Sequence, residues 1–222
     1  MPRKDLNDMS IRIKKVANEF GNSPLGKSPL AKQPLVATPS TILAMVMDAM
    51  IKSKPISHDI SQKTMNHLIE AGYHDIDKLH KSTWEERTEV LREGGYNRYR
   101  EQSATNLGNL AQFVMDKYDG DLNNLLKRAH GRREKTRPLI KEIKGIGELA
   151  VELFFDNVQS VWPSIAPFVD SRSLQTAEEV GIGANMQAVY SALDQDPKQM
   201  SWFVNGLSSV RLEKKQFAIE ST

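Results

Sequence analysis

Residues 139–154 decide the fold, and they read LIKEIKGIGELAVELF. Apolar side chains recur at helical spacing on both sides of Gly145-Ile146-Gly147. Two glycines at such a junction permit a tight turn with a positive φ and a close approach by another backbone. We therefore predict two helices joined by a hairpin, with Ile146 pointing back into the core.

The second helix of this hairpin directs its free N–H groups and its positive dipole end outward. A helix start of this kind binds anions, and a DNA phosphate suits it. The alternative is a plain glycine cap between two packed helices, with no ligand at all. The hairpin alone leaves both interpretations open.

The charge distribution bears on that choice. Residues 127–144 contain eight Lys or Arg and two Glu, whereas residues 145–200 contain eight Asp or Glu and two basic residues. A basic run is often only a solvated helix face. Placed directly before a hairpin of backbone amides, it favours phosphate binding.

The composition sets outer limits for the 222 residues. A content of 39% hydrophobic and 26% charged residues is typical of a soluble globular protein. The longest apolar stretch, residues 42–51, is interrupted by Asp48 and is too short to cross a bilayer, so we expect no membrane partner. The absence of Cys excludes disulfides, thiolate zinc sites and a Cys-ligated iron–sulfur cluster.

The rest of the chain predicts an all-α protein, because no run alternates with the period of a strand. Four prolines predict an extended linker over residues 21–40, and Thr38 before Pro39 is typical of a helix N-cap. Helical spacing predicts helices over residues 1–20, 41–53, 59–71, 75–79, 83–93, 99–118, 121–129, 137–143, 148–156, 171–179, 185–193 and 197–208.

A second stretch follows the hairpin at residues 162–174, which read WPSIAPFVDSRSL. Together the two stretches resemble the helix–hairpin–helix, Gly/Pro-rich, catalytic-Asp superfamily of DNA glycosylases, and endonuclease III most of all. The family pattern is a Leu-Pro-Gly-Val-Gly hairpin, a helix, a Pro-containing loop and Val-Asp before another helix. The resemblance covers residues 38–182 and includes residues 95–100, which are similar to the family's Gly-x-Tyr-Asn-x-Lys turn.

This resemblance implies a two-lobed all-α fold. Residues 38–160 would form a six-helix barrel lobe that contains the hairpin. Residues 1–37, an N-terminal helix and a Pro-rich linker, would pack with the C-terminal lobe. Residues 161–222 would supply the catalytic-Asp loop and the C-terminal helices.

The resemblance assigns catalysis to Asp170. Excision of a base breaks an N-glycosidic bond and leaves positive charge on the sugar in the transition state, so a nearby carboxylate stabilises it or activates the nucleophile. The base must first leave the stack. From the residues alone, a helix N-cap is the better explanation of Asp170, and only the resemblance favours catalysis.

The sequence departs from the family pattern at three points. Bifunctional members place a Lys, which forms a Schiff base, two residues after the second hairpin glycine; here Leu149 stands there, so no AP-lyase activity of that kind is expected. A family Gln that fills the space left by the flipped base aligns with Met50, which donates no hydrogen bonds. No iron–sulfur cluster or other cofactor is expected, although the hairpin could hold a monovalent cation.

The resemblance also implies a set of DNA contacts. It comprises Lys144, Gly145, Ile146, Gly147, Glu148, Arg172, Met50, Tyr96 and Arg98. Tyr96 is either a wedge between base pairs or a half-buried core residue. Arg172 could touch a phosphate or pair with Asp170, and Glu148 either is an alternative acid or complements the helix dipole.

These features predict a monofunctional glycosylase of base-excision repair. It would act as a monomer on double-stranded DNA that contains a damaged or mismatched base. It would work in the cytoplasm or nucleoid of a bacterium or archaeon, or in the nucleus of a eukaryote. The alternatives are a non-catalytic DNA-binding relative and a helical adaptor whose hairpin is plain packing.

Overall fold

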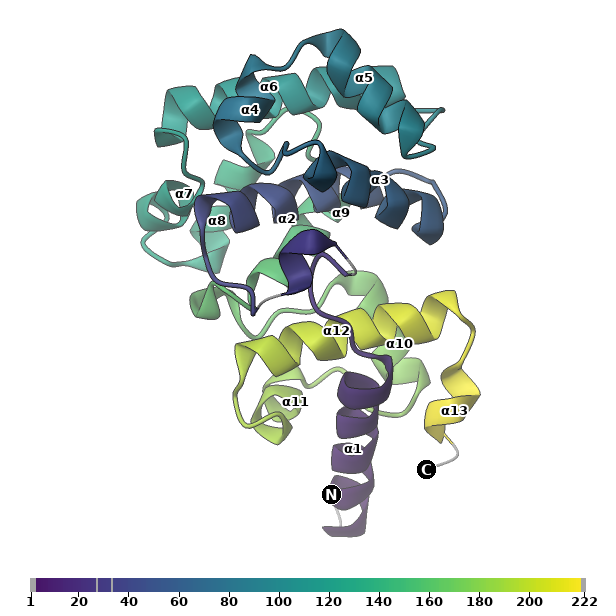
Figure 1. Ribbon diagram of the computed structural model, residues 1–222. Coiled ribbons are helices and arrows are strands. Elements are labelled where there is room, and N and C mark those ends of the chain that lie inside the picture. Colours follow the sequence, from purple (N-terminus) through teal and green to yellow (C-terminus); the bar gives the residue numbers. More distant parts are fainter. Residues whose placement is uncertain (1–2, 27, 33, 221–222) are drawn as a thin grey trace. The chain divides into compact units, whose positions relative to one another are not determined.

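The protein is described by a computed structural model that covers residues 3–26, 28–32 and 34–220 (Figure 1). Every regular element in these ranges is helical, which confirms the predicted all-α class. The chain forms two compact units, one of residues 25–154 and one that joins residues 1–24 to residues 155–222. The boundary between residues 154 and 155 falls inside one helix, α9 (Glu148–Val158).

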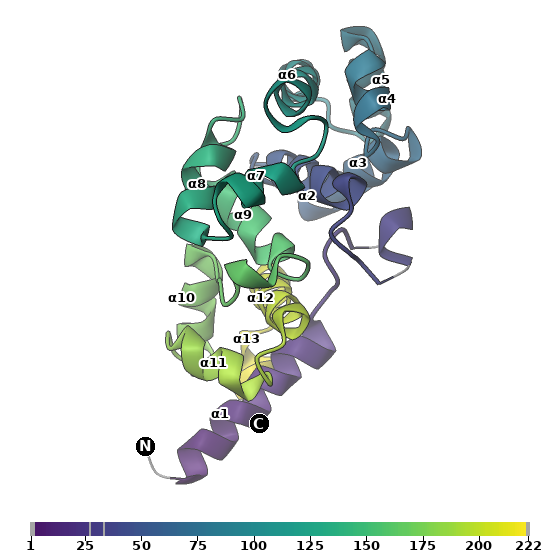
Figure 2. The same cartoon turned by 90° about the vertical axis from the view of Figure 1, so that its left-hand side faces the viewer.

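The unit of residues 25–154 contains seven further α-helices among its described residues. They are α2 (Pro39–Lys52), α3 (His58–Glu70), α4 (Ile76–Lys81), α5 (Trp84–Glu93), α6 (Arg100–Tyr118), α7 (Asn123–Arg128) and α8 (Arg133–Lys141), preceded by a 3-10 turn at Pro29–Lys32. The α2 helix contacts α3, and α5 contacts α6. Figure 2 shows these helices from a second side.

The α2 helix forms the centre of this unit. Thr38 caps it as predicted, because its side chain accepts a hydrogen bond from the Thr41 N–H at 3.1 Å. Every residue from 41 to 51 is buried. The run is almost wholly apolar, so this helix loses contact with water on all sides.

The linker before α2 is not merely extended. Leu25 is 1% exposed, and Gln62 of α3 donates a hydrogen bond to its carbonyl oxygen at 3.5 Å. We expected the linker to pack with the C-terminal residues, whereas its residues from 25 onward lie in the unit of residues 25–154. The apolar Leu25 anchors the segment there.

The start of α8 differs from its prediction over residues 137–143. The helix begins at Arg133 and ends at Lys141. Its first turn consists largely of charged residues and has no apolar periodicity, so the sequence did not indicate a helix there. The buried positions of the helix, Thr136 and Ile140, come only after that turn.

The other unit is built from both ends of the chain. It contains α1 (Arg3–Lys15), a π-helical segment (Val16–Phe20), a 3-10 turn (Pro163–Ile165), α10 (Ser171–Glu179), α11 (Met186–Ala192), α12 (Pro197–Leu212) and α13 (Gln216–Glu220). Its core joins Ile13, Val16 and Ala17 to apolar residues of the C-terminal helices.

The N-terminal segment therefore does not form the single helix predicted for residues 1–20. The chain passes from α-helix to π-helix at Val16, where it packs against α12. Gly206 of α12 permits this contact, because a Cβ atom there would overlap the Val16 carbonyl oxygen. In the described part of the chain, no helix is long and apolar enough to cross a membrane.

Candidate functional site

The hairpin between α8 and α9 contains a tight turn. The Ile146 N–H donates to the Ile143 carbonyl at 3.1 Å, and Gly145 has a φ of +93°. A Cβ atom on Gly145 would lie 2.5 Å from the Asn106 side-chain nitrogen of α6. Gly145 is therefore required both by its backbone angle and by its neighbour.

Gly147 differs from Gly145 in both respects. Its φ is not positive, and a Cβ atom built on it would have no atom of the described chain within 4 Å. Nothing inside the protein requires a glycine here, whereas a ligand that approaches the backbone closely would. Ile146, between the two glycines, is 7% exposed, as its expected packing into the core demands.

The start of α9 presents its backbone donors at this turn. The first hydrogen bond of the helix runs from the Val151 N–H to the Gly147 carbonyl at 3.1 Å. The amides of residues 148–150 accordingly have no acceptor within the helix. Free amides, the positive dipole end and an open glycine together make a surface that suits an oxyanion.

The charged side chains of the hairpin fall into two groups. Lys144 is exposed, and no partner for it is found among the described residues. Glu148 instead forms ion pairs with two residues of α8, Arg137 and Lys141, the latter at 3.0 Å. Glu148 thus ties the two hairpin helices together, and its one negative charge is shared by two cations of the basic run.

The rest of the basic run is only partly engaged. Lys127 bonds to Asn124 at 2.9 Å, and the Arg128 guanidinium lies 5.1 Å from the centre of the Tyr118 ring. Arg132 has a carboxylate, Glu134, at 3.9 Å. These contacts are exposed or peripheral and leave the positive charge available to solvent.

Tyr96 is a core residue, so the expectation that it is a wedge between base pairs is wrong. It is 0% exposed, and its hydroxyl donates to the Ile51 carbonyl of α2 at 2.9 Å. Burial raises the pKa of its phenol well above the ordinary value. Arg98, two residues later, is exposed, and its guanidinium carbon lies 5.2 Å from the Tyr99 ring centre.

Met50 was expected to fill the space left by a flipped base. Its side chain is 5% exposed and belongs to the buried run of α2. In this structure it packs within the protein and does not project into solvent. The apolar character that suggested a gap-filling side chain has the simpler consequence of burial.

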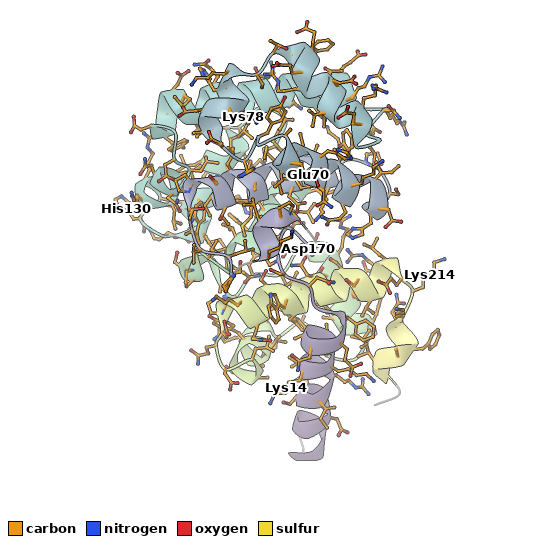
Figure 3. All side chains as sticks on the ribbon, in the orientation of Figure 1. Lys14, Glu70, Lys78, His130, Asp170 and Lys214 are labelled. Carbon is orange, nitrogen blue, oxygen red and sulfur yellow. The ribbon has the colours of Figure 1, made fainter. Side chains whose placement is uncertain are left out.

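Asp170, labelled in Figure 3, directly precedes α10 and caps it. Its Oδ1 accepts hydrogen bonds from the N–H groups of Arg172 at 3.0 Å and Ser173 at 3.2 Å. The side chain is fully buried, yet no described residue donates to its Oδ2. A buried carboxylate oxygen without a donor is costly, which makes it a candidate for chemistry.

Two arginines lie near this carboxylate. The Arg172 Nε is 3.8 Å from the Asp170 Oδ1, a loose pair between a buried acid and a half-exposed base. Arg211 of α12 is partly buried and donates to hydroxyls of Thr176 at 3.5 Å and Ser208 at 3.3 Å. Burial lowers the pKa of Arg211, and the nearby Asp170 charge opposes that shift.

Two polar residues at the end of α9 were not anticipated. Asp156 is 3% exposed, and its carboxylate accepts a hydrogen bond from the Asp170 N–H at 3.0 Å. Gln159 is 0% exposed and bonds to both the N–H and the carbonyl of Phe168, each at 3.0 Å. Their signal in the sequence is a pair of polar residues, three apart, that ends an apolar helix.

The described residues contain no group of three or more His, Asp or Glu that could hold a metal ion. Among the described residues, the hairpin and Asp170 are therefore our two candidates for ligand binding and catalysis. The hairpin offers backbone donors and Lys144, and Asp170 offers an acceptor oxygen without a donor.

Comparison with known proteins gives structural matches only. No family model matches the sequence, and neither does any curated protein. The H. pylori 3-methyladenine DNA glycosylase (MagIII), solved bound to 1,N6-ethenoadenine, has a TM-score of 0.56 and 13% sequence identity. The match covers 95% of this chain and 98% of the other. A trapped endonuclease III–DNA covalent intermediate has a TM-score of 0.49 and 16% identity over 92% of this chain and 84% of the other.

The match to the H. pylori enzyme covers nearly the whole of both chains. The protein therefore shares the fold of this DNA glycosylase, and the predicted all-α fold class is confirmed. A fold does not by itself carry an activity.

Proposed function

We propose that this protein is a DNA glycosylase that hydrolyses the N-glycosidic bond of a flipped base. The observation that carries this proposal is Asp170, a buried carboxylate at the start of α10 with one oxygen used for capping and the other without a donor among the described residues. A purely structural N-cap needs only the first of these. The glycosylase fold supplies the context.

The two carboxylate oxygens of Asp170 would have different roles, one in orienting the side chain and one in the reaction. Oδ1 is held by two backbone amides, which fix the orientation of the carboxylate. Oδ2 is then free to stabilise positive charge on the sugar or to accept a proton from the attacking water. Because the side chain is fully buried, its surroundings must open when the nucleotide enters.

The hairpin would hold the DNA backbone without reading its sequence. The amides of residues 148–150 and Lys144 would contact phosphates, and Gly147 would let the phosphate come close. Arg98 and Arg172 would add exposed positive charge. The partner is accordingly double-stranded DNA with a lesion.

The product of the reaction would be an intact abasic strand. Leu149 occupies the position of the family's lyase Lys and has no amine to form a Schiff base. We propose that no iron–sulfur cluster takes part, since the chain has no Cys to hold one.

The test is single-turnover base release from duplexes that carry alkylated, deaminated, oxidised or mismatched bases. The panel starts with 3-methyladenine and 1,N6-ethenoadenine, because these are the bases named for the structurally similar enzyme. We expect release of at least one base, with strand cleavage only after alkali. Asp170→Asn keeps a good N-cap and should lower the rate about 10²- to 10⁴-fold.

The matched control is Asp196→Asn. Asp196 caps α12 by accepting from the Lys198 N–H at 2.8 Å, so the substitution changes the same chemistry at another helix start. It should leave base release unchanged. Duplex binding without release of any base would instead favour a non-catalytic DNA-binding relative, whereas a chain that binds no duplex would fit an adaptor.

A further inference from the structure

We propose that Asp156 and Gln159 are positioning residues that clamp the loop before Asp170 and so aim its carboxylate. The inference rests on the proposed function, because it assigns the two residues a role in the reaction of Asp170. Neither side chain touches the reacting atoms. Both act through the backbone of the loop.

The clamp holds two alternate residues of the loop. Gln159 pairs through its amide with both backbone groups of Phe168, and Asp156 accepts from the backbone N–H of Asp170. Asp156 lies in the last turn of α9, and Gln159 directly follows the helix with its N–H still bonded to the Phe155 carbonyl at 3.2 Å. The spacing of three residues therefore places both side chains on the same side. The Phe168 ring also packs edge-on against Phe155, with 5.2 Å between ring centres.

The end of α9 is itself anchored to α12. The Ser201 hydroxyl donates to the Asp156 carbonyl at 2.7 Å, and the Asn205 amide donates to the Asn157 side chain at 3.0 Å. These residues belong to the unit that joins residues 1–24 to residues 155–222. The clamp therefore has a fixed base in the same unit.

The far side of Asp170 is anchored to α12 as well. Asp170 accepts from the Ser173 N–H, and the Ser173 hydroxyl lies 3.2 Å from that of Ser208. Arg211, one turn of α12 further on, donates to the Ser208 hydroxyl. Asp170 thus has its main-chain N–H fixed by α9 and its side chain fixed by α10, with α12 behind both.

The free-energy cost of burying these two polar side chains indicates that they do more than fill space in the core. A buried carboxylate and a buried amide are expensive unless their hydrogen bonds are made. Both are used here on one short loop, at the two residues that immediately surround Val169. Placing a charged group near a reacting sugar demands an accuracy of about an ångström, which such bonds provide.

The experiment compares Asp156→Leu and Gln159→Met with Asp156→Asn. The Leu and Met substitutions remove the loop bonds at similar side-chain volume, whereas Asn retains an oxygen that can accept from the Asp170 N–H. Three quantities are measured for each variant: hydrogen exchange of the Phe168 and Asp170 amides, duplex affinity, and single-turnover base release.

We expect the Leu and Met variants to exchange these amides at least tenfold faster and to release base about 10- to 100-fold more slowly. Duplex affinity should change less than twofold, because the hairpin is untouched. Asp156→Asn should rescue most of the rate. Leu68→Ala, which opens the core of residues 25–154 and so lies in the other unit from the loop, should destabilise the protein and leave the rate unchanged.

Two results would overturn the inference: unchanged amide exchange in both variants, or faster exchange with unchanged base release. If the wild-type protein released no base, the proposed function would fail, and amide exchange alone would decide whether the clamp exists. If Asp156→Leu did not fold, Gln159→Met would carry the same test.

Discussion

The two hairpin glycines differ in what requires them. Gly145 has a positive φ and the Asn106 side chain against it, whereas Gly147 has neither constraint. The need for Gly145 is thus intramolecular, whereas no described residue requires a glycine at position 147, where the proposed function places a phosphate. Substitution separates the two.

We expect Gly145→Ala to lower the free energy of unfolding by about 1–3 kcal/mol, because it strains the backbone and displaces Asn106. Gly147→Ala should leave stability within about 0.5 kcal/mol, since the position is open. It should still weaken binding to every duplex alike. Urea unfolding and fluorescence anisotropy check the two effects, and undiminished affinity of Gly147→Ala would remove the hairpin from the interface.

At this scale the sequence predicted the local chemistry of the site and missed its tertiary part. Asp170 as a cap follows from its neighbours, but the missing donor at its Oδ2 depends on the whole packed unit. The sequence left Tyr96 open as a wedge or a core residue, because its hydroxyl partner Ile51 lies 45 residues away. Asp156 and Gln159 were overlooked for the same reason.

Among the elements, helix starts that carry a local cap could be predicted, whereas the start of α8, which has no side-chain cap, could not. Thr38 and Thr83 cap α2 and α5, and in each case the cap lies within three residues of its partner. Such local signals can be seen in the sequence. The π-helical segment at Val16–Phe20 could not be seen there, because it depends on the close approach that Gly206 of α12 allows.

The α8 and α9 helices are joined by charge as well as by the turn. Glu148 pairs with Arg137 and Lys141, all three at least partly exposed. Pairs of this kind contribute little to stability. Their larger effect is on the charge that the hairpin surface carries, and the proposed function makes this charge testable.

Glu148→Gln should therefore change the free energy of unfolding by less than about 1 kcal/mol. It should tighten duplex binding, because two cations are released and one anion is lost. The slope of log affinity against log salt should steepen by about 1 for each new phosphate contact. Salt titrations of binding measure this, with Glu178→Gln on α10 as the exposed-acid control; weaker binding would mean that the Glu148 carboxylate itself is needed.

For the whole molecule, the division into two units predicts uneven responses to substitution. Gly206→Ala should disturb the packing of α12 on the Val16–Phe20 segment, at a cost of about 1–3 kcal/mol for overpacking. Hydrogen exchange should rise across residues 1–24 and 155–222 and stay nearly constant across residues 25–154. A uniform rise would show that the chain opens as one cooperative block.

The N-terminal helix and its packing partners are made at different times during synthesis. The helix that contains Ile13 packs with residues that follow position 155, so its partners leave the ribosome only after the whole of residues 25–154. The intervening unit can fold while it emerges, as domains generally do during synthesis. The apolar residues of the nascent N-terminal helix therefore stay exposed to solvent until residues 155–222 have been synthesised. Slow translation of that last segment would lengthen this exposure and with it the time available for a chaperone to bind.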